Sequence, residues 1–141
     1  ISGYEGWAKS FGGLGDVKGI NMAVDSGGNI FIAGYFNGID VDFDPSSQTD
    51  LHSSNGVKDI FVSRINSDGS YAWTKTIGGV SDDIAEGIAV DSFDNIFFTG
   101  YFQGTDIDFD PGVGVDNHSS STNRSHYITK LQEDHHKLKK E

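Results

Sequence analysis

The chain contains two copies of one sequence unit, and this repeat limits the folds open to it. Trp7-Ala8-Lys9 returns as Trp73-Thr74-Lys75, and Asp42-Phe43-Asp44-Pro45 returns as Asp108-Phe109-Asp110-Pro111, each time 66 residues later. Aligning residues 7–65 with 73–131 needs no gap and gives 25 identities in 59 positions. Such a period is typical of proteins in which each repeat buries its apolar faces against neighbouring repeats.

Each unit predicts four short strands, because short runs rich in β-branched and aromatic residues alternate with turn residues. Gly, Asn and Asp stand between these runs and suit tight hairpins. The predicted strands are residues 86–91, 95–103, 126–131 (59–65 in the first unit) and 70–77, whose copy near the start of the chain is 4–11. Four antiparallel strands per repeat are typical of a β-propeller blade. We therefore predict an all-β, propeller-like fold with two four-stranded antiparallel blades.

Several of the repeated motifs also resemble a known family. The motifs are Gly87-Ile88-Ala89-Val90-Asp91-Ser92, Asn95-Ile96-Phe97, Thr99-Gly100-Tyr101-Phe102, Asp108-Phe109-Asp110-Pro111-Gly112 and Trp73-Thr74-Lys75 with Gly78-Gly79. They resemble the bacterial β-propeller repeats of the SBBP type, which occur in large secreted and cell-surface proteins. The resemblance implies a propeller fold and an extracellular or bacterial cell-surface location. The family usually carries many units, whereas this chain has two.

In chain order, the predicted strands do not divide into two complete blades. The first repeat unit covers residues 1–66 and the second 67–131, followed by a charged tail, 132–141. The last set of predicted strands, residues 86–131, lacks a fourth strand, while 4–11 is a fourth strand without first, second and third strands before it. We expect 4–11 to complete a blade of a neighbouring copy, which gives a closed ring or a filament; a fragment of a longer propeller is the alternative. The predicted interface residues are Tyr4, Trp7, Phe11, Tyr127, Ile128 and Leu131.

Aspartates recur in the long segments 38–58 and 104–125, between the second and third strands of each unit. Alternate residues of an extended segment point to one side, so three carboxylates would meet there. Calcium binds six to eight oxygen ligands and would relieve their repulsion. The predicted ligands are Asp40, Asp42, Asp44, Asp106, Asp108 and Asp110. The alternative is that these aspartates cap turns and face solvent, while Phe43 and Phe109 pack inward.

Repeated aromatic residues give a second interpretation of function. Tyr35-Phe36 returns as Tyr101-Phe102. Aromatic residues at equivalent strand positions are expected in the core between blades. The alternative is a platform on which sugar rings stack, which beside the acidic loops would suit a calcium-dependent lectin or an adhesive module that binds a surface glycan.

The composition and motifs of the chain argue against several other classes of protein. The net charge is −11, which argues against binding nucleic acid through its phosphates. No apolar run is long enough to span a membrane. The chain has no cysteine, and it carries no nucleophile elbow, P-loop or HExxH motif. We therefore expect a structural, self-assembling protein rather than an enzyme.

Overall fold

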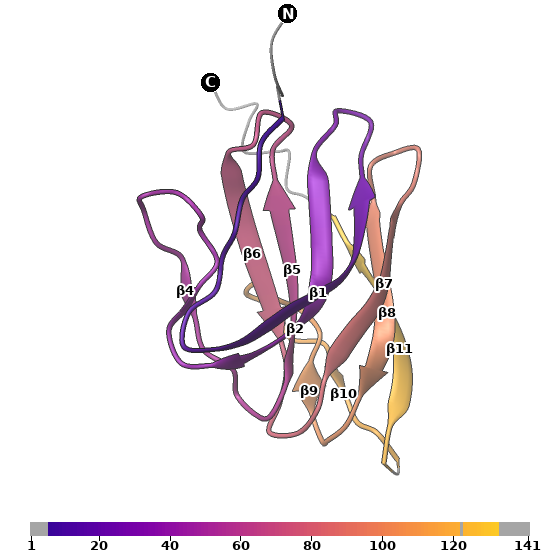
Figure 1. The fold of residues 1–141 in the computed structure, drawn as a ribbon. Helices are drawn as coiled ribbons and strands as arrows, with labels where there is room; N and C mark the ends of the chain where they lie inside the picture. The colour runs from indigo at the N-terminus through magenta and orange to yellow at the C-terminus, as the bar shows by residue number, and fades with distance from the viewer. Residues whose placement is uncertain (1–5, 122, 133–141) are drawn as a thin grey trace, which may run out of the picture.

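The computed structural model describes residues 6–121 and 123–132, and within them the chain forms only strands, turns and loops (Figure 1). The first sheet contains four antiparallel strands in the order β1-β2-β5-β6. These strands are β1 Gly15–Val24, β2 Ile30–Gly38, β5 Asp59–Ile65 and β6 Tyr71–Ile77. The described part of the chain has no helix of the length and apolarity that crossing a membrane requires.

The second sheet contains three antiparallel strands in the order β11-β8-β7. They are β7 Ile84–Val90, β8 Ile96–Phe102 and β11 Ser125–Leu131. They correspond in sequence to β1, β2 and β5, so the second sheet repeats the first without a counterpart of β6. The all-β, antiparallel fold is confirmed. In one chain the second blade has three strands, and its completion by another copy stays a prediction.

A small hairpin follows the second strand of each sheet. In the first sheet, β3 Val41–Asp42 pairs with β4 Leu51–His52; in the second, β9 Ile107–Asp108 pairs with β10 Asn117–His118. The sequence predicted only that these segments are long insertions. The hairpins give them a fixed shape in both repeats.

An aspartate fixes each turn between the first two strands of a sheet. The Asp91 carboxylate accepts N–H bonds from Phe93 and Asn95 and a third bond from the Asn95 side chain, at 2.9 to 3.0 Å. The bonds from Asn95 lower the pKa of Asp91. Asp25 accepts the equivalent bonds in the first sheet. These are the turn bonds that Asx residues typically make.

The two sheets pack face to face around a shared apolar core, with β1 and β2 beside β7. Strands β2, β5 and β6 meet β7, β8 and the β9 hairpin there, and the core consists of Ala33, Ile60, Val62, Ile77, Ala85, Phe98, Phe102, Ile107 and Phe109. The opposite face of the first sheet is covered by its own hairpin, through Phe36, Val41, Phe43 and Phe61. The repeat-equivalent phenylalanines Phe36 and Phe102 therefore form core, as the sequence predicts, whereas their neighbours Tyr35 and Tyr101 are only partly buried.

Candidate functional site

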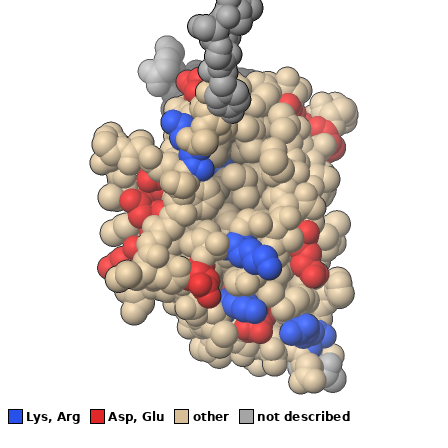
Figure 2. Space-filling model, in the orientation of Figure 1, with Lys and Arg blue, Asp and Glu red and all other residues tan. Residues whose placement is uncertain are grey.

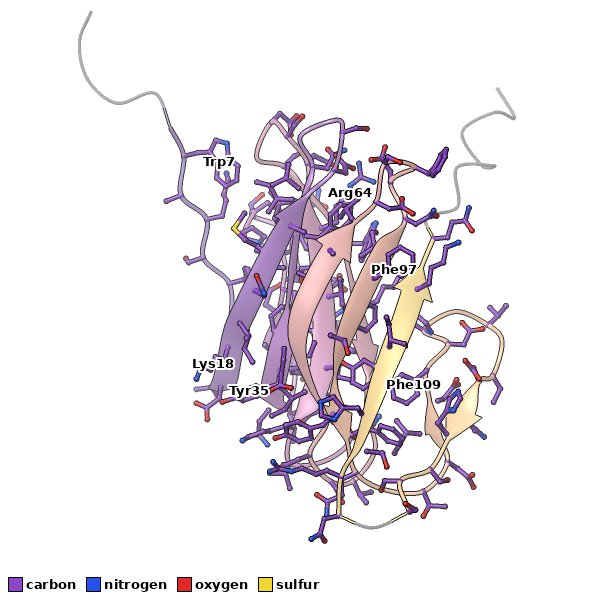
Figure 3. All side chains as sticks on the ribbon, turned by 90° about the vertical axis from the view of Figure 1, so that its right-hand side faces the viewer. Trp7, Lys18, Tyr35, Arg64, Phe97 and Phe109 are labelled. Carbon is purple, nitrogen blue, oxygen red and sulfur yellow. The ribbon has the colours of Figure 1, made fainter. Side chains whose placement is uncertain are left out.

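The outer edge of β11 is the most open part of the backbone. This strand pairs with β8 on one side, and none of the residues that the structure describes pairs with its other side. A groove of about 730 Å³ lies beside this strand, and it is lined by residues 125–132, by Phe102 and Phe109, and by the β9–β10 hairpin through Asp110, Pro111, Asp116, His118 and Ser119. Figure 3 shows Phe109 next to β11. An unpaired edge of this kind is a template for an added strand.

The first sheet shows what occupies the equivalent place. There β6 pairs along β5, with Ile60 opposite Ile77, Val62 opposite Lys75 and Ser63 opposite Thr74. The hydroxyl oxygens of Ser63 and Thr74 lie 2.6 Å apart. Val62, which packs against the second sheet, is 1% exposed, whereas its equivalent in β11, Ile128, is 76% exposed. Strand β11 therefore lacks the cover that β5 has.

The N-terminal segment provides a sequence equivalent of β6 on the other side of the molecule. Residues 6–11 are not paired as a strand in the single chain. Phe11 nevertheless packs on the face of the first sheet that its hairpin covers, with its ring centroid 5.6 Å from that of Phe43 and 6.2 Å from that of Phe61. Its repeat equivalent, Ile77 of β6, belongs to the core that contains Phe109. The segment therefore lies against the first sheet much as β6 lies against the second.

The predicted interface residues fall into two groups. Trp7 lies on the opposite side of the molecule from β11 (Figure 3) and is 43% exposed, and Phe11 packs against Phe43 and Phe61 of the first repeat. Tyr127, Ile128 and Leu131 lie in β11. Tyr4 is outside the described residues. One chain does not bring the two groups together, so the predicted contact requires two copies.

The aspartates proposed as calcium ligands mostly bond main-chain amides. Asp42 Oδ1 accepts the N–H groups of Asp44 and Asp50, both at 3.0 Å, and Asp44 accepts the N–H of Ser46 at 2.8 Å. Asp108 and Asp110 accept equivalent bonds in the second hairpin. The bonds from Asp116 and Asp110 lower the pKa of Asp108. These contacts match the turn-capping alternative.

The first aspartate of each set of three differs from the other two in its backbone conformation. Asp40 and Asp106 both adopt a φ of 54°, in the left-handed region that Asp tolerates. Across the described ranges, no three His, Asp or Glu side chains gather where they could hold a metal ion. Calcium therefore stays a prediction, and stability measurements can test it.

We expect Asp42→Ala to destabilise the chain by about 1–3 kcal/mol, because the amides of Asp44 and Asp50 lose their acceptor. The loss should be the same with calcium and with a chelator, measured by thermal unfolding. Asp40→Asn is the matched control, since asparagine also tolerates this φ. An effect of either variant that appears only with calcium would assign the ion to this hairpin.

Two of the four residues of the proposed sugar-binding platform are buried in the core. Phe36 is fully buried and Phe102 is 4% exposed, each edge-on to the next phenylalanine of its repeat at 5.2 Å. A sugar cannot stack on either ring without opening the sheet. Tyr35 and Tyr101 are partly exposed, but cations cover their rings: Lys58 Nζ lies 4.8 Å from the first ring centroid, and Arg124 Cζ 4.1 Å from the second. Glycan binding stays a prediction that rests on these two tyrosines.

Charge is mixed on the face shown in Figure 2, where acidic and basic side chains lie among a majority of uncharged residues. This face therefore presents no continuous basic surface of the kind that binds phosphates.

The fold defines an all-β repeat protein built from two similar antiparallel sheets. Comparison with known families agrees: residues 72–108 match the SBBP β-propeller repeat, and the chain therefore contains an SBBP β-propeller repeat. This confirms the resemblance read from the motifs.

A curated relative is also a repeat protein. An uncharacterized WD repeat-containing protein of Acanthamoeba polyphaga mimivirus is 30% identical over 110 residues, which is 68% of this chain and 8% of the relative. The chain thus spans under a tenth of that protein's length. No solved structure matches the chain.

Proposed function

We propose that this chain is a structural interaction module that joins a second copy of itself by adding residues 4–11 of that copy to the free edge of β11. The observation that carries this proposal is the unpaired edge of β11, which has a groove beside it and no counterpart of β6. Residues 4–11 supply such a counterpart in sequence. Addition of a strand to a sheet edge is a common mode of protein association, because main-chain hydrogen bonds give affinity and side-chain pockets give specificity.

Repeat equivalence predicts the register of the added strand. The pairs Ile60–Ile77, Val62–Lys75 and Ser63–Thr74 of β5 and β6 translate into His126–Phe11, Ile128–Lys9 and Thr129–Ala8 between copies. In this register, Trp7 lies opposite Lys130, because Trp73 lies opposite Arg64. Phe31 contacts Trp73 at 6.1 Å between ring centroids, so Phe97 of β8 would contact Trp7.

Repetition of the contact joins each copy to the next. If the copies return to the starting point they form a closed ring, and otherwise a filament. The first sheet of the joining copy would then face β11 and cover Ile128, which is 76% exposed in the single chain, as the second sheet covers Val62. The proposed role is therefore assembly rather than catalysis, in an extracellular or cell-surface setting.

Cysteine pairs test the register. The natural chain has no cysteine, so single-cysteine variants report one contact each. We expect Ala8→Cys mixed with Thr129→Cys to form a disulfide between chains under mild oxidation, because directly opposed residues have Cβ atoms about 4.5–5.5 Å apart. Light scattering of the natural chain should give a mass well above 15.2 kDa.

Two controls make the result decisive. Ser63→Cys with Thr74→Cys in one chain should form the equivalent bond inside the molecule, since those side chains are already in contact. Ser10→Cys with Thr129→Cys places the sulfurs one diagonal step apart, about 7–8 Å, and should not bond. A monomeric mass together with no Ala8–Thr129 bond, while the internal control forms, would overturn the proposal.

A further inference from the structure

Two buried carboxylates lie on either side of the connection between the sheets. Asp59, the first residue of β5, is 1% exposed, and Asp83, just before β7, is fully buried. The Asp59 carboxylate lies against Gly78 so closely that a side chain there would collide with it. Asp83 accepts the N–H of Gly79 at 2.9 Å. The segment that links one blade to the next thus runs between two acids.

Hydrogen bonds satisfy this pair only in part. Asp83 also accepts the N–H of Gln103 at 3.2 Å, and Asp59 Oδ2 accepts the N–H of Asn55 at 2.8 Å. Asp59 Oδ1 is buried and makes no hydrogen bond of ordinary geometry, although the backbone amide of Gly56 is close enough to lower the pKa of Asp59 in part. A buried polar oxygen without a donor is costly, and more so when it carries charge.

The surroundings supply no positive charge to the pair. Within the described residues, the ionisable groups that act on it are Asp82, beside Asp83, and Tyr127 of β11, besides the two acids themselves. Lys58 is next to Asp59 in sequence, but its Nζ lies over the Tyr35 ring. The described residues also provide no third acidic or histidine ligand that would make a metal site. Neutralisation by a proton is the remaining route.

Burial, with a further contribution from the charge of Asp83, raises the pKa of Asp59 to about 6. Burial raises the pKa of Asp83 as well. Both shifts agree with the geometry, in which two carboxylates share a poorly solvated joint.

We propose that the joint between the two sheets is a proton-binding site formed by Asp59 and Asp83, which makes the contact between the blades stronger in mild acid than at neutral pH. The site is particular to this joint. The repeat places Ser125 where Asp59 stands and Val17 where Asp83 stands. A joint built from those residues would contain neither acid, so a contact with a second copy would not share this pH dependence.

The direction of the effect follows from proton linkage. A carboxyl whose pKa is higher in the folded state holds a proton that the unfolded chain has released. The free-energy cost of ionising this carboxyl in the folded state is absent below its unfolded pKa of 3.8. The cost grows as pH rises and is complete above the folded pKa of about 6. Stability from this source therefore falls as pH rises through that window.

The test compares the pH dependence of unfolding in the natural chain and in Asp59→Asn. For Asp59 alone, we expect the unfolding constant to rise about tenfold between about pH 5 and about pH 8. Asp59→Asn removes the titrating group and should therefore abolish this tenfold rise in the unfolding constant. Asp16→Asn is the matched control, because it deletes the same charge from an exposed position and should keep the full change. Carbon-13 NMR of the aspartate carboxyls in the natural chain gives a direct second measurement, with Asp59 expected to titrate near pH 6.

Three results would overturn the proposal. One is an Asp59 carboxyl that titrates near its ordinary value of 3.8. Another is a pH dependence that Asp59→Asn leaves as large as Asp16→Asn does. The third is stabilisation by calcium at neutral pH that disappears in Asp59→Asn, because a cation rather than a proton would then neutralise the joint. The titration of the Asp59 carboxyl reports on this joint itself, whether or not the chain joins a second copy.

Discussion

Replacement of Phe43 by alanine is expected to lower the free energy of unfolding by about 3–5 kcal/mol, the usual loss for a buried phenylalanine. Phe43 is fully buried although it stands in the loop beyond β3. Its ring centroid lies 5.2 Å from that of Phe36, 5.1 Å from Phe61 and 5.6 Å from Phe11. The cavity would therefore open between the hairpin and the sheet, and urea unfolding followed by tryptophan fluorescence would measure the loss.

Phe93→Ala is the matched control, because it deletes the same side chain from a hairpin turn where the ring is 85% exposed. Its effect should stay within about 0.5 kcal/mol. A loss below about 1 kcal/mol for Phe43→Ala would show that the hairpin is not packed on the sheet as described. The capping role of Asp42 would then be in doubt as well, since Asp42 and Phe43 belong to the same hairpin.

The long strands could be predicted from the sequence because two independent signals agree there. Alternation of apolar residues indicates each strand, and the 66-residue offset indicates it a second time. The expected ranges 59–65 and 70–77 are close to β5 Asp59–Ile65 and β6 Tyr71–Ile77. The turn role of Asp91 follows from the same reasoning, because Asx turns are local and need only a few residues.

The small hairpins could not be predicted in this way. Strands β3 and β4 have two residues each, too few to show any period. The alternation in Asp40-Val41-Asp42 suggested that the carboxylates share one side, but Asp40 has a φ of 54° and breaks the extended run. Asp42 instead accepts amides within the hairpin. The left-handed φ of Asp40 thus breaks the alternation from which a shared side was inferred, while calcium binding itself stays a prediction.

The open edge of β11 and the buried acids Asp59 and Asp83 also differ in whether the sequence predicts them. The edge of β11 could be predicted, because a missing fourth strand shows in the order of the strands. The burial of Asp59 and Asp83 could not, since it depends on how one sheet sits on the next. A signal was nevertheless present: both positions depart from the repeat, which has Ser125 and Val17 instead. In a repeat protein, a charged residue that is uncharged in the other copy can mark a joint between units that differs from the rest.

Gly34→Ala is expected to lower the free energy of unfolding by about 3 kcal/mol, the upper end of the usual range for overpacking, because the strands must move apart to admit one methyl group. A Cβ on Gly34 would overlap the Lys18 carbonyl oxygen of β1, and a Cβ on Gly100 would overlap the Ile84 carbonyl oxygen of β7 in the same way. Gly87→Ala is the control, since its nearest neighbour would be the Thr99 methyl at an ordinary 3.5 Å. Urea unfolding should separate the two variants clearly. If Gly34→Ala is tolerated as well as Gly87→Ala, the first two strands do not pair in the register given, and the core between the sheets must be arranged differently.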